Sequence, residues 1–366
     1  MKRCYRISIF LILITLLSLS LISGTSKFSV AKLEIGNNDS FEKRIMSIAQ
    51  NDNKVMDHLF HLTDRIGVRP FGSENLQAAC EWARNKFIEF GLSDVHLEKF
   101  MTVHADTANF NNSIPLYNVV ADIPGSEKSD ECVIVGAHID SHDAGTGAAD
   151  NGTGVAAVME AARILIKADA KPKRTIRFIL FSAEEIGKLG SKAYVDAHAD
   201  IMPKVSAMLN MDQGSNYISG IYATNGLMED FKKVFAPVKS LDPDMPFTIE
   251  KVEHLEQNMK NCCGGRGSSD HGPFFEAGVP AFFWLQEGKN PVAYPAHTKE
   301  DTYDKVIPEY MKHSATVIAR GSLGIANLDH LLSRENLFDP QTVKDATDDC
   351  CSKVQPQECC AANKAK

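Results

Sequence analysis

The chain has 366 residues, of which 44% are hydrophobic and 23% are charged, and its formal net charge is -8. This composition is ordinary for a globular protein, and the length suits one large α/β domain or two smaller ones. Lys and Arg do not gather in a block, which excludes the clustered basic surface typical of nucleic-acid binders. We therefore expect no nucleic-acid partner.

The N-terminus predicts an export signal over residues 1–26. Lys2, Arg3 and Arg6 precede an apolar run at residues 7–22, and small residues follow it, as in secretory signal peptides. A spanning helix needs about 20 consecutive apolar residues, so the alternative of a permanent anchor is less favoured. We expect a secreted or periplasmic protein without a stable membrane span after signal cleavage.

Hydrophobic periodicity predicts alternating helices and strands along the chain. Residues 41–64 fit one or two helices, Ser73 is placed to cap a helix that ends before Gly91, and a Pro-Gly turn separates two strands. The predicted strands cover residues 116–123, 132–137, 175–182, 205–211 and 281–285, and further helices cover residues 154–168, 191–199, 228–237 and 308–332.

This alternation predicts a three-layer α/β domain with a mostly parallel mixed central sheet flanked by helices. We expect the domain over residues 35–335, followed by a cysteine-rich tail at residues 336–366. Four of the nine cysteines lie in this tail as two adjacent pairs. Zinc sites favour spacings such as C-x-x-C, and export favours disulfides, so no catalytic role is expected for the tail.

Acidic and imidazole side chains follow the predicted strands at the carboxyl ends, where open α/β sheets gather their sites. Each one alone has an ordinary explanation, such as a packed histidine, a solvated glutamate or a helix cap at Asp150. Their recurrence at successive strand ends makes chance the weaker explanation. These side chains are His138, Asp140, Asp150, Glu184, Glu185, Asp212 and His297.

Five segments of the chain carry a resemblance to a known family. They are GAHIDSHDAGTGAADNGTGVAAVMEAARIL, FILFSAEEIGKLGSKAYV, MLNMDQGSN, SSDHGPFFEAGVPAFF and YPAHTKEDTYDKV. They look like the successive signatures of the co-catalytic zinc exopeptidases, which include bacterial leucyl aminopeptidases and plasma glutamate carboxypeptidase. The resemblance covers about residues 41–331, and it implies a metallopeptidase with two zinc ions per chain.

The resemblance also implies roles for individual residues. Asp150 would bridge both ions, and the other ligands would be His138, Glu185, Asp212 and His297. Carboxylates and neutral imidazoles are ligands that suit zinc. Glu184 would be the catalytic base, and Asp140 would hold the His138 ring through its second nitrogen, as carboxylates do in many zinc sites.

The expected reaction is hydrolysis of a terminal peptide bond in a peptide or dipeptide, by an aminopeptidase or a dipeptidase/carboxypeptidase. Asp270 is either a helix cap or a wall of the substrate pocket, and Tyr294 either donates to the substrate carbonyl or packs in the core. One alternative is a single-zinc acyltransferase resembling glutaminyl cyclases, and another is a non-catalytic binding relative. The sequence makes no prediction about the oligomeric state or the terminus that is recognised.

Overall fold

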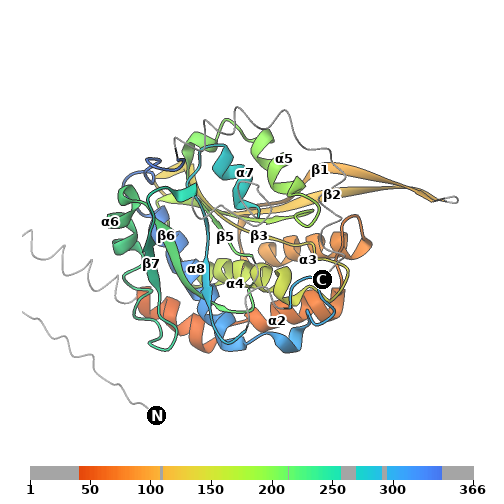
Figure 1. Ribbon diagram of the computed structural model, residues 1–366, viewed down its shortest axis with the longest axis horizontal. Coiled ribbons are helices and arrows are strands. Elements are labelled where there is room, and N and C mark those ends of the chain that lie inside the picture. Colours follow the sequence, from red (N-terminus) through yellow and green to blue (C-terminus); the bar gives the residue numbers. More distant parts are fainter. Residues whose placement is uncertain (1–40, 108–109, 213, 257–268, 291–294, 340–366) are drawn as a thin grey trace, which may run out of the picture. The chain divides into compact units, whose positions relative to one another are not determined.

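The computed structural model describes residues 41–107, 110–212, 214–256, 269–290 and 295–339 (Figure 1). The chain divides into two units, Met1–Lys43 and Arg44–Lys366. Of the first unit only residues 41–43 are described, and they are helical. The predicted signal peptide, Tyr294 and the tail beyond residue 339 lie outside the described residues. Within the described ranges, no helix is both long and apolar enough to cross a membrane.

A six-stranded sheet forms the centre of the second unit, with strand order β1-β2-β4-β3-β5-β8. β3 pairs in parallel with both β4 and β5, and β5 pairs in parallel with β8. Both antiparallel pairs of this sheet involve β2, which pairs with β1 and with β4. The prediction of a mostly parallel mixed sheet is confirmed. The strands are β1 Ser93–Thr107, β2 Phe110–Ile123, β3 Lys128–His138, β4 Arg174–Phe181, β5 Val205–Asn210 and β8 Ala281–Phe283.

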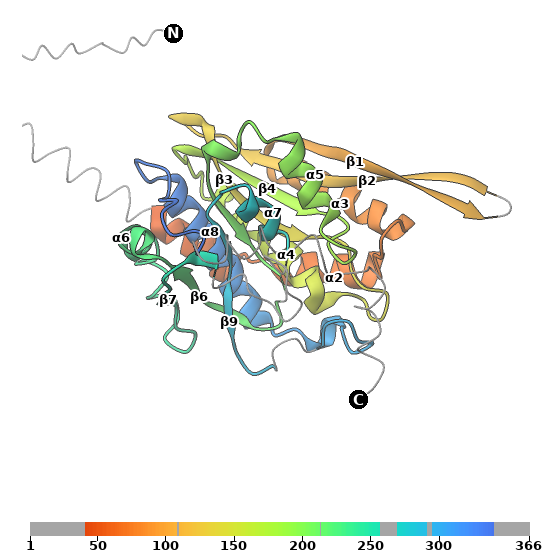
Figure 2. The ribbon, with the colours of Figure 1, turned by 45° about the horizontal axis from the view of Figure 1, so that its top comes forward.

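Helices cover both faces of this sheet, which gives the three layers expected from the sequence (Figures 1 and 2). On one face α3, α4 and α8 each contact the strands, and α2 packs against α4 and α8. Residues 153–165 of α4 are all buried, which explains why this segment is mostly apolar on every side. The helices of this face are α2 Val55–Phe60, α3 Glu74–Phe90, α4 Thr153–Lys167 and α8 Pro308–Ala326, and α5 Leu189–Ala197 and α7 His271–Glu276 cover the other face.

The predicted ends of α3 are confirmed. The Ser73 side chain accepts a hydrogen bond from the Leu76 amide, and Gly91 ends the helix at φ 93°, a left-handed conformation that favours glycine. The prediction for α8 was too long, because the helix ends at Ala326 and not at residue 332.

Several strands differ from the prediction. The strand expected at residues 281–285 divides into β8 and β9 (Leu285–Glu287), and β9 belongs to a second, three-stranded sheet. The other strands of that sheet are β6 (Tyr217–Ala223) and β7 (Thr248–Lys251), and the helix α6 (Asn225–Val234) packs against both of them. β1 was not predicted, and it forms a long hairpin with β2 that extends beyond the other strands (Figure 2).

Candidate metal centre

The register of the sheet brings the predicted site residues to one edge. His138, the last residue of β3, lies opposite Phe181, the last residue of β4. Asn210, the last residue of β5, lies opposite Gly136 of β3. Three segments therefore leave the sheet side by side, and they carry Asp140, the pair Glu184 and Glu185, and Asp212.

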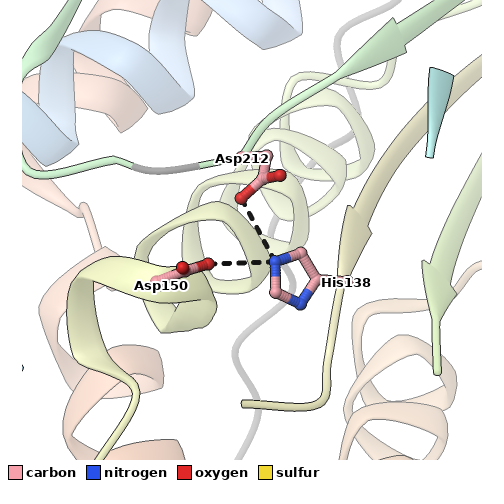
Figure 3. Close-up of side chains that lie close together, drawn as sticks. All are labelled: His138, Asp150 and Asp212. Carbon is pink, nitrogen blue, oxygen red and sulfur yellow. Dashed lines mark hydrogen bonds and ion pairs between the residues drawn. The ribbon is translucent and has the colours of Figure 1, made fainter. Parts of the chain in front are cut away.

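Three of these residues form a buried group that we call the inner cluster: His138, Asp150 and Asp212 (Figure 3). The His138 Nε2 lies 3.1 Å from an oxygen of Asp150 and 3.1 Å from an oxygen of Asp212. The opposite ring nitrogen, Nδ1, lies 3.5 Å from a carboxylate oxygen of Asp140 and 3.2 Å from its backbone oxygen. One ring nitrogen is thus oriented by Asp140 while the other faces two carboxylates.

A second group, the outer cluster, consists of Asp150, Glu185 and His297. The His297 Nε2 lies 3.1 Å from Asp150 Oδ2 and 2.9 Å from Glu185 Oε2. The inner cluster uses Asp150 Oδ1, so the two oxygens of Asp150 belong to different clusters. Asp150 is the corner that the two clusters share.

Backbone hydrogen bonds hold Asp150 in this position. The amides of Ala149 and Asp150 donate to the two carboxylate oxygens of Asp301, at 2.5 and 3.1 Å. The helix-cap alternative for Asp150 is wrong, because the N-cap of α4 is Gly152 and the first-turn amide of Gly154 donates to the Asn151 side chain, not to Asp150. Sequence patterns did not single out Asp301, although it lies four residues after His297 in a segment that carries the family resemblance.

The turn after β4 is fixed by Asp140. The Glu184 and Glu185 amides donate to the two oxygens of the Asp140 carboxylate, both at 3.2 Å. Ala183 adopts φ 63°, so the chain turns sharply just before the glutamates. Asp140 therefore connects the His138 ring to the glutamate pair.

Asp270 is fully buried and does not cap α7. One of its oxygens accepts a hydrogen bond from the Ser191 hydroxyl at 2.5 Å, and the other has no hydrogen-bond partner among the described residues. The helix-cap alternative for Asp270 is wrong, and its place in a substrate pocket stays a prediction.

The carboxylates of the two clusters favour the protonated, positively charged form of both imidazoles. Desolvation lowers the pKa of His138, but Asp212, Asp140 and Asp150 outweigh it and raise this pKa well above its usual value. Hydrogen bonds to Asp150 and Glu185 raise the pKa of His297 to about 10. Desolvation raises the pKa of Asp150, and the two imidazoles outweigh this effect and lower it. Carboxylates in excess of cations, together with imidazole nitrogens, form a donor set that fits divalent ions such as zinc.

Glu184 is distinguished from the other carboxylates by its environment. Burial raises its pKa, and the nearby Asp212, Asp270 and Asp140 raise it further because like charges disfavour ionisation. His138 opposes this shift, as a bound cation would also do. A partly buried glutamate beside a cation site is suited to proton transfer near neutral pH.

Comparisons with known proteins agree with this site. Residues 118–321 match the model of peptidase family M28, which covers more than half of the chain. The chain therefore belongs to peptidase family M28 and is a metallopeptidase by family, as the resemblance implied.

Two curated relatives illustrate the membership. Carboxypeptidase Q of Mus musculus is 30% identical over 240 residues, which are 66% of this chain and 46% of that protein. Leupeptin-inactivating enzyme 1 of Streptomyces exfoliatus is 30% identical over 218 residues, or 58% of this chain and 43% of that protein. The chain thus spans about half the length of the curated relatives it matches.

Solved structures share the fold. A peptidase M28 precursor from Shewanella amazonensis gives a TM-score of 0.67 at 21% identity, covering 82% of this chain and 98% of that one. The zinc aminopeptidase BSAP from Bacillus subtilis gives a TM-score of 0.58 at 16% identity, covering 78% of this chain and 97% of that one. Both confirm the predicted fold class.

Proposed function

We propose that the chain is a secreted exopeptidase that binds two zinc ions, one in each cluster, and hydrolyses a terminal peptide bond. The observation that carries the proposal is the position of Asp150, whose two oxygens face different imidazoles at 3.1 Å each. A carboxylate shared in this way is expected where two cations lie close together. Family membership supports the peptidase activity.

The ligand roles follow from the two clusters. His138, Asp150 and Asp212 would hold one ion, and Asp150, Glu185 and His297 would hold the other. When bound, the ions supply a water of increased acidity and polarise the scissile carbonyl. Asp140 lies beside Nδ1 of His138 and orients the ring, so that Nε2, the nitrogen that would bind the metal, faces the inner cluster.

Glu184 is the proposed general base. It accepts a proton from the attacking water and passes it to the leaving amine, so it must hold that proton between the two steps. Its raised pKa makes the carboxylate a stronger base, and bound cations, like His138, would lower this pKa so that the carboxylate is ionised before it accepts the proton. The amide of Glu184, bonded to Asp140, keeps the backbone of the base fixed relative to the ligands.

The remaining assignments complete this proposal. Asp270 and Tyr294 belong to the substrate pocket, the catalytic domain spans residues 35–335, and the signal peptide directs export. The substrate is a peptide or dipeptide. A single bound zinc without peptidase activity would instead favour the glutaminyl cyclase-like alternative.

The test is to offer the purified protein N-blocked peptides, C-blocked peptides and free dipeptides, each with and without a chelator. The proposal predicts cleavage of at least one class and its loss with the chelator. Cleavage of C-blocked but not N-blocked peptides identifies an aminopeptidase, and the reverse identifies a carboxypeptidase. No cleavage of any class by zinc-loaded protein would refute the proposal.

A further inference from the structure

Arg69 is a fully buried arginine that lies beneath the loop between β3 and α4. Four N–H groups of its guanidinium donate to backbone carbonyls, which are those of Gly67 (2.8 Å), Ile139 (2.9 Å), Thr146 (2.8 Å) and Gly147 (2.9 Å). Three of these carbonyls belong to the loop that joins His138 to Asp150. One side chain therefore holds both the beginning and the end of this loop.

The backbone of Arg69 is bound to the same loop. Its amide donates to the Ser141 hydroxyl at 3.0 Å, and its carbonyl accepts from the Ser141 amide at 3.1 Å. Gly147 packs so closely that a Cβ there would lie 2.3 Å from the Ser141 Cβ and 2.9 Å from the guanidinium. The loop is thus closed tightly around Arg69.

The charge of Arg69 has no direct acidic partner among the described residues. The carboxylates that act on it, those of Asp140, Asp301, Asp150 and Glu185, do so at longer range. Burial lowers its pKa to about 10, so the group stays charged at neutral pH. Burial of a charge is costly unless the group is hydrogen-bonded, and the four carbonyls supply these bonds to Arg69.

From these contacts we propose that Arg69 is a positioning residue for the metal centre, which fixes the loop from Ile139 to Gly147 so that His138 and Asp150 face a common cation. Asp301 holds the amides of Ala149 and Asp150 at the end of the same loop. The inference rests on the proposed two-zinc function. Residues that orient metal ligands through such contacts typically change metal affinity by about 10–100-fold when replaced.

Two roles of Arg69 predict opposite changes in zinc affinity. If the charge dominates, Arg69→Met removes a cation that repels zinc, so this variant binds zinc more tightly and Arg69→Lys resembles wild type. If positioning dominates, both variants bind more weakly, because neither lysine nor methionine can reach four carbonyls at once. The sign of the change separates the two roles.

Arg174 provides a matched control. It is also fully buried, and it donates to the Glu131 carboxylate and the Leu328 carbonyl. It begins β4, whereas the clusters lie beyond the other end of that strand, about 23 Å away at about 3.3 Å per residue. Arg174→Lys therefore perturbs an equally buried arginine without touching the loop.

The experiment measures zinc affinity of the metal-free proteins by competition with a chromophoric chelator, after circular dichroism confirms that each variant is folded. We expect Arg69→Lys and Arg69→Met to bind zinc about 10–100-fold more weakly, and Arg174→Lys to match wild type. The kcat of Arg69→Lys should return to the wild-type value at saturating zinc, which a general loss of structure would not allow. Wild-type affinity in Arg69→Lys, or tighter binding in Arg69→Met, overturns the inference.

A second variant covers the case in which the Arg69 variants do not fold. Ser141→Ala removes the acceptor of the Arg69 amide and leaves the guanidinium in place, and we expect about tenfold weaker zinc binding. Unchanged affinity in this variant contradicts the inference. If the wild-type protein binds no zinc, the proposed function fails. If the wild-type protein binds two ions and the substitutions leave its zinc affinity unchanged, only the inference about Arg69 fails.

Discussion

Buried carboxylates lie just before the N-terminus of α4 and at the middle of this helix, and their surroundings differ. At the middle of the helix, Glu160 accepts two hydrogen bonds from Arg163 at 2.8 Å each, and it lies 3.3 Å from His58. Asp52 continues this group by pairing with Arg163 at 3.1 Å and Lys167 at 2.5 Å. We call these five residues the α4 ion-pair network. Its acids are matched by cations of the same chain.

The N-terminal end of α4 is different. Asp150 shares its surroundings with Asp212, Glu185 and Asp140, and the basic groups that contact it directly are two imidazoles. These imidazoles show raised pKa values because the acids outnumber the cations. The comparison suggests that buried acids with their own cations stabilise the fold, whereas acids in excess are arranged for a cation that comes from outside.

The largest expected effect comes from replacing the shared corner. Asp150→Ala removes one ligand from each cluster, so we expect loss of both zinc ions and a fall in kcat/KM of more than about 10⁴-fold. Elemental analysis and peptide hydrolysis measure the two effects. The control is Asp169→Ala, an exposed aspartate just beyond the other end of α4 that pairs with Lys171. Retained zinc in Asp150→Ala would contradict the shared role.

The next effect separates catalysis from metal binding. Glu184→Gln keeps the shape of the side chain but cannot accept a proton, so kcat should fall by about 10²–10⁴-fold while zinc content stays at the wild-type level. The exposed Glu81 is the control, and Glu81→Gln should change neither quantity. A Glu184→Gln variant that loses zinc, or one that keeps its full kcat, would show that Glu184 is not the base.

Replacement in the α4 ion-pair network should affect stability and not chemistry. Glu160→Gln leaves Arg163 without its buried partner, and we expect a loss of about 3 kcal/mol in the free energy of unfolding. Zinc content and the kcat of the folded protein should stay unchanged. Glu89→Gln breaks an exposed pair with Lys86 and should cost under about 1 kcal/mol. Denaturant titration of both variants checks the difference.

The smallest effect is expected at the edge of the α4 ion-pair network. Hydrogen bonds from Lys167 and Arg163 lower the pKa of Asp52 to about 2. A depressed pKa stabilises the fold above the ordinary value of 3.8, and this contribution is lost as pH falls toward 2. Because the Asp52 side chain is 40% exposed, Asp52→Asn should cost under about 1 kcal/mol at pH 7. The difference from wild type should shrink between pH 4 and 2 in denaturant titrations.

The sequence predicted most of the parts of the fold that are buried on both sides, although it missed the buried strand β6. β3, β4, β5 and α4 have continuous apolar runs, and each was found within a few residues of its observed ends. The hairpin strand β1 was missed, although Val95, Leu97, Met101 and Val103 follow a two-residue period. β7 was missed because four mostly exposed residues carry no clear hydrophobic pattern.

The site was predictable to the extent that its chemistry lies in side chains at strand ends. The inner and outer clusters bring together all five predicted ligands. Arg69 and Asp301 were not found, because they bind backbone carbonyls and amides, and every residue type offers these groups. Their partners are set by the folded loop and leave no spacing in the sequence.

The central claim is that two cations lie in clusters that share Asp150. Its most direct test is the number of zinc ions bound per chain, measured by equilibrium dialysis and elemental analysis of the metal-free protein at saturating free zinc. The account predicts two ions per chain in wild type and in Glu160→Gln. One ion or none in the folded wild-type protein would contradict it.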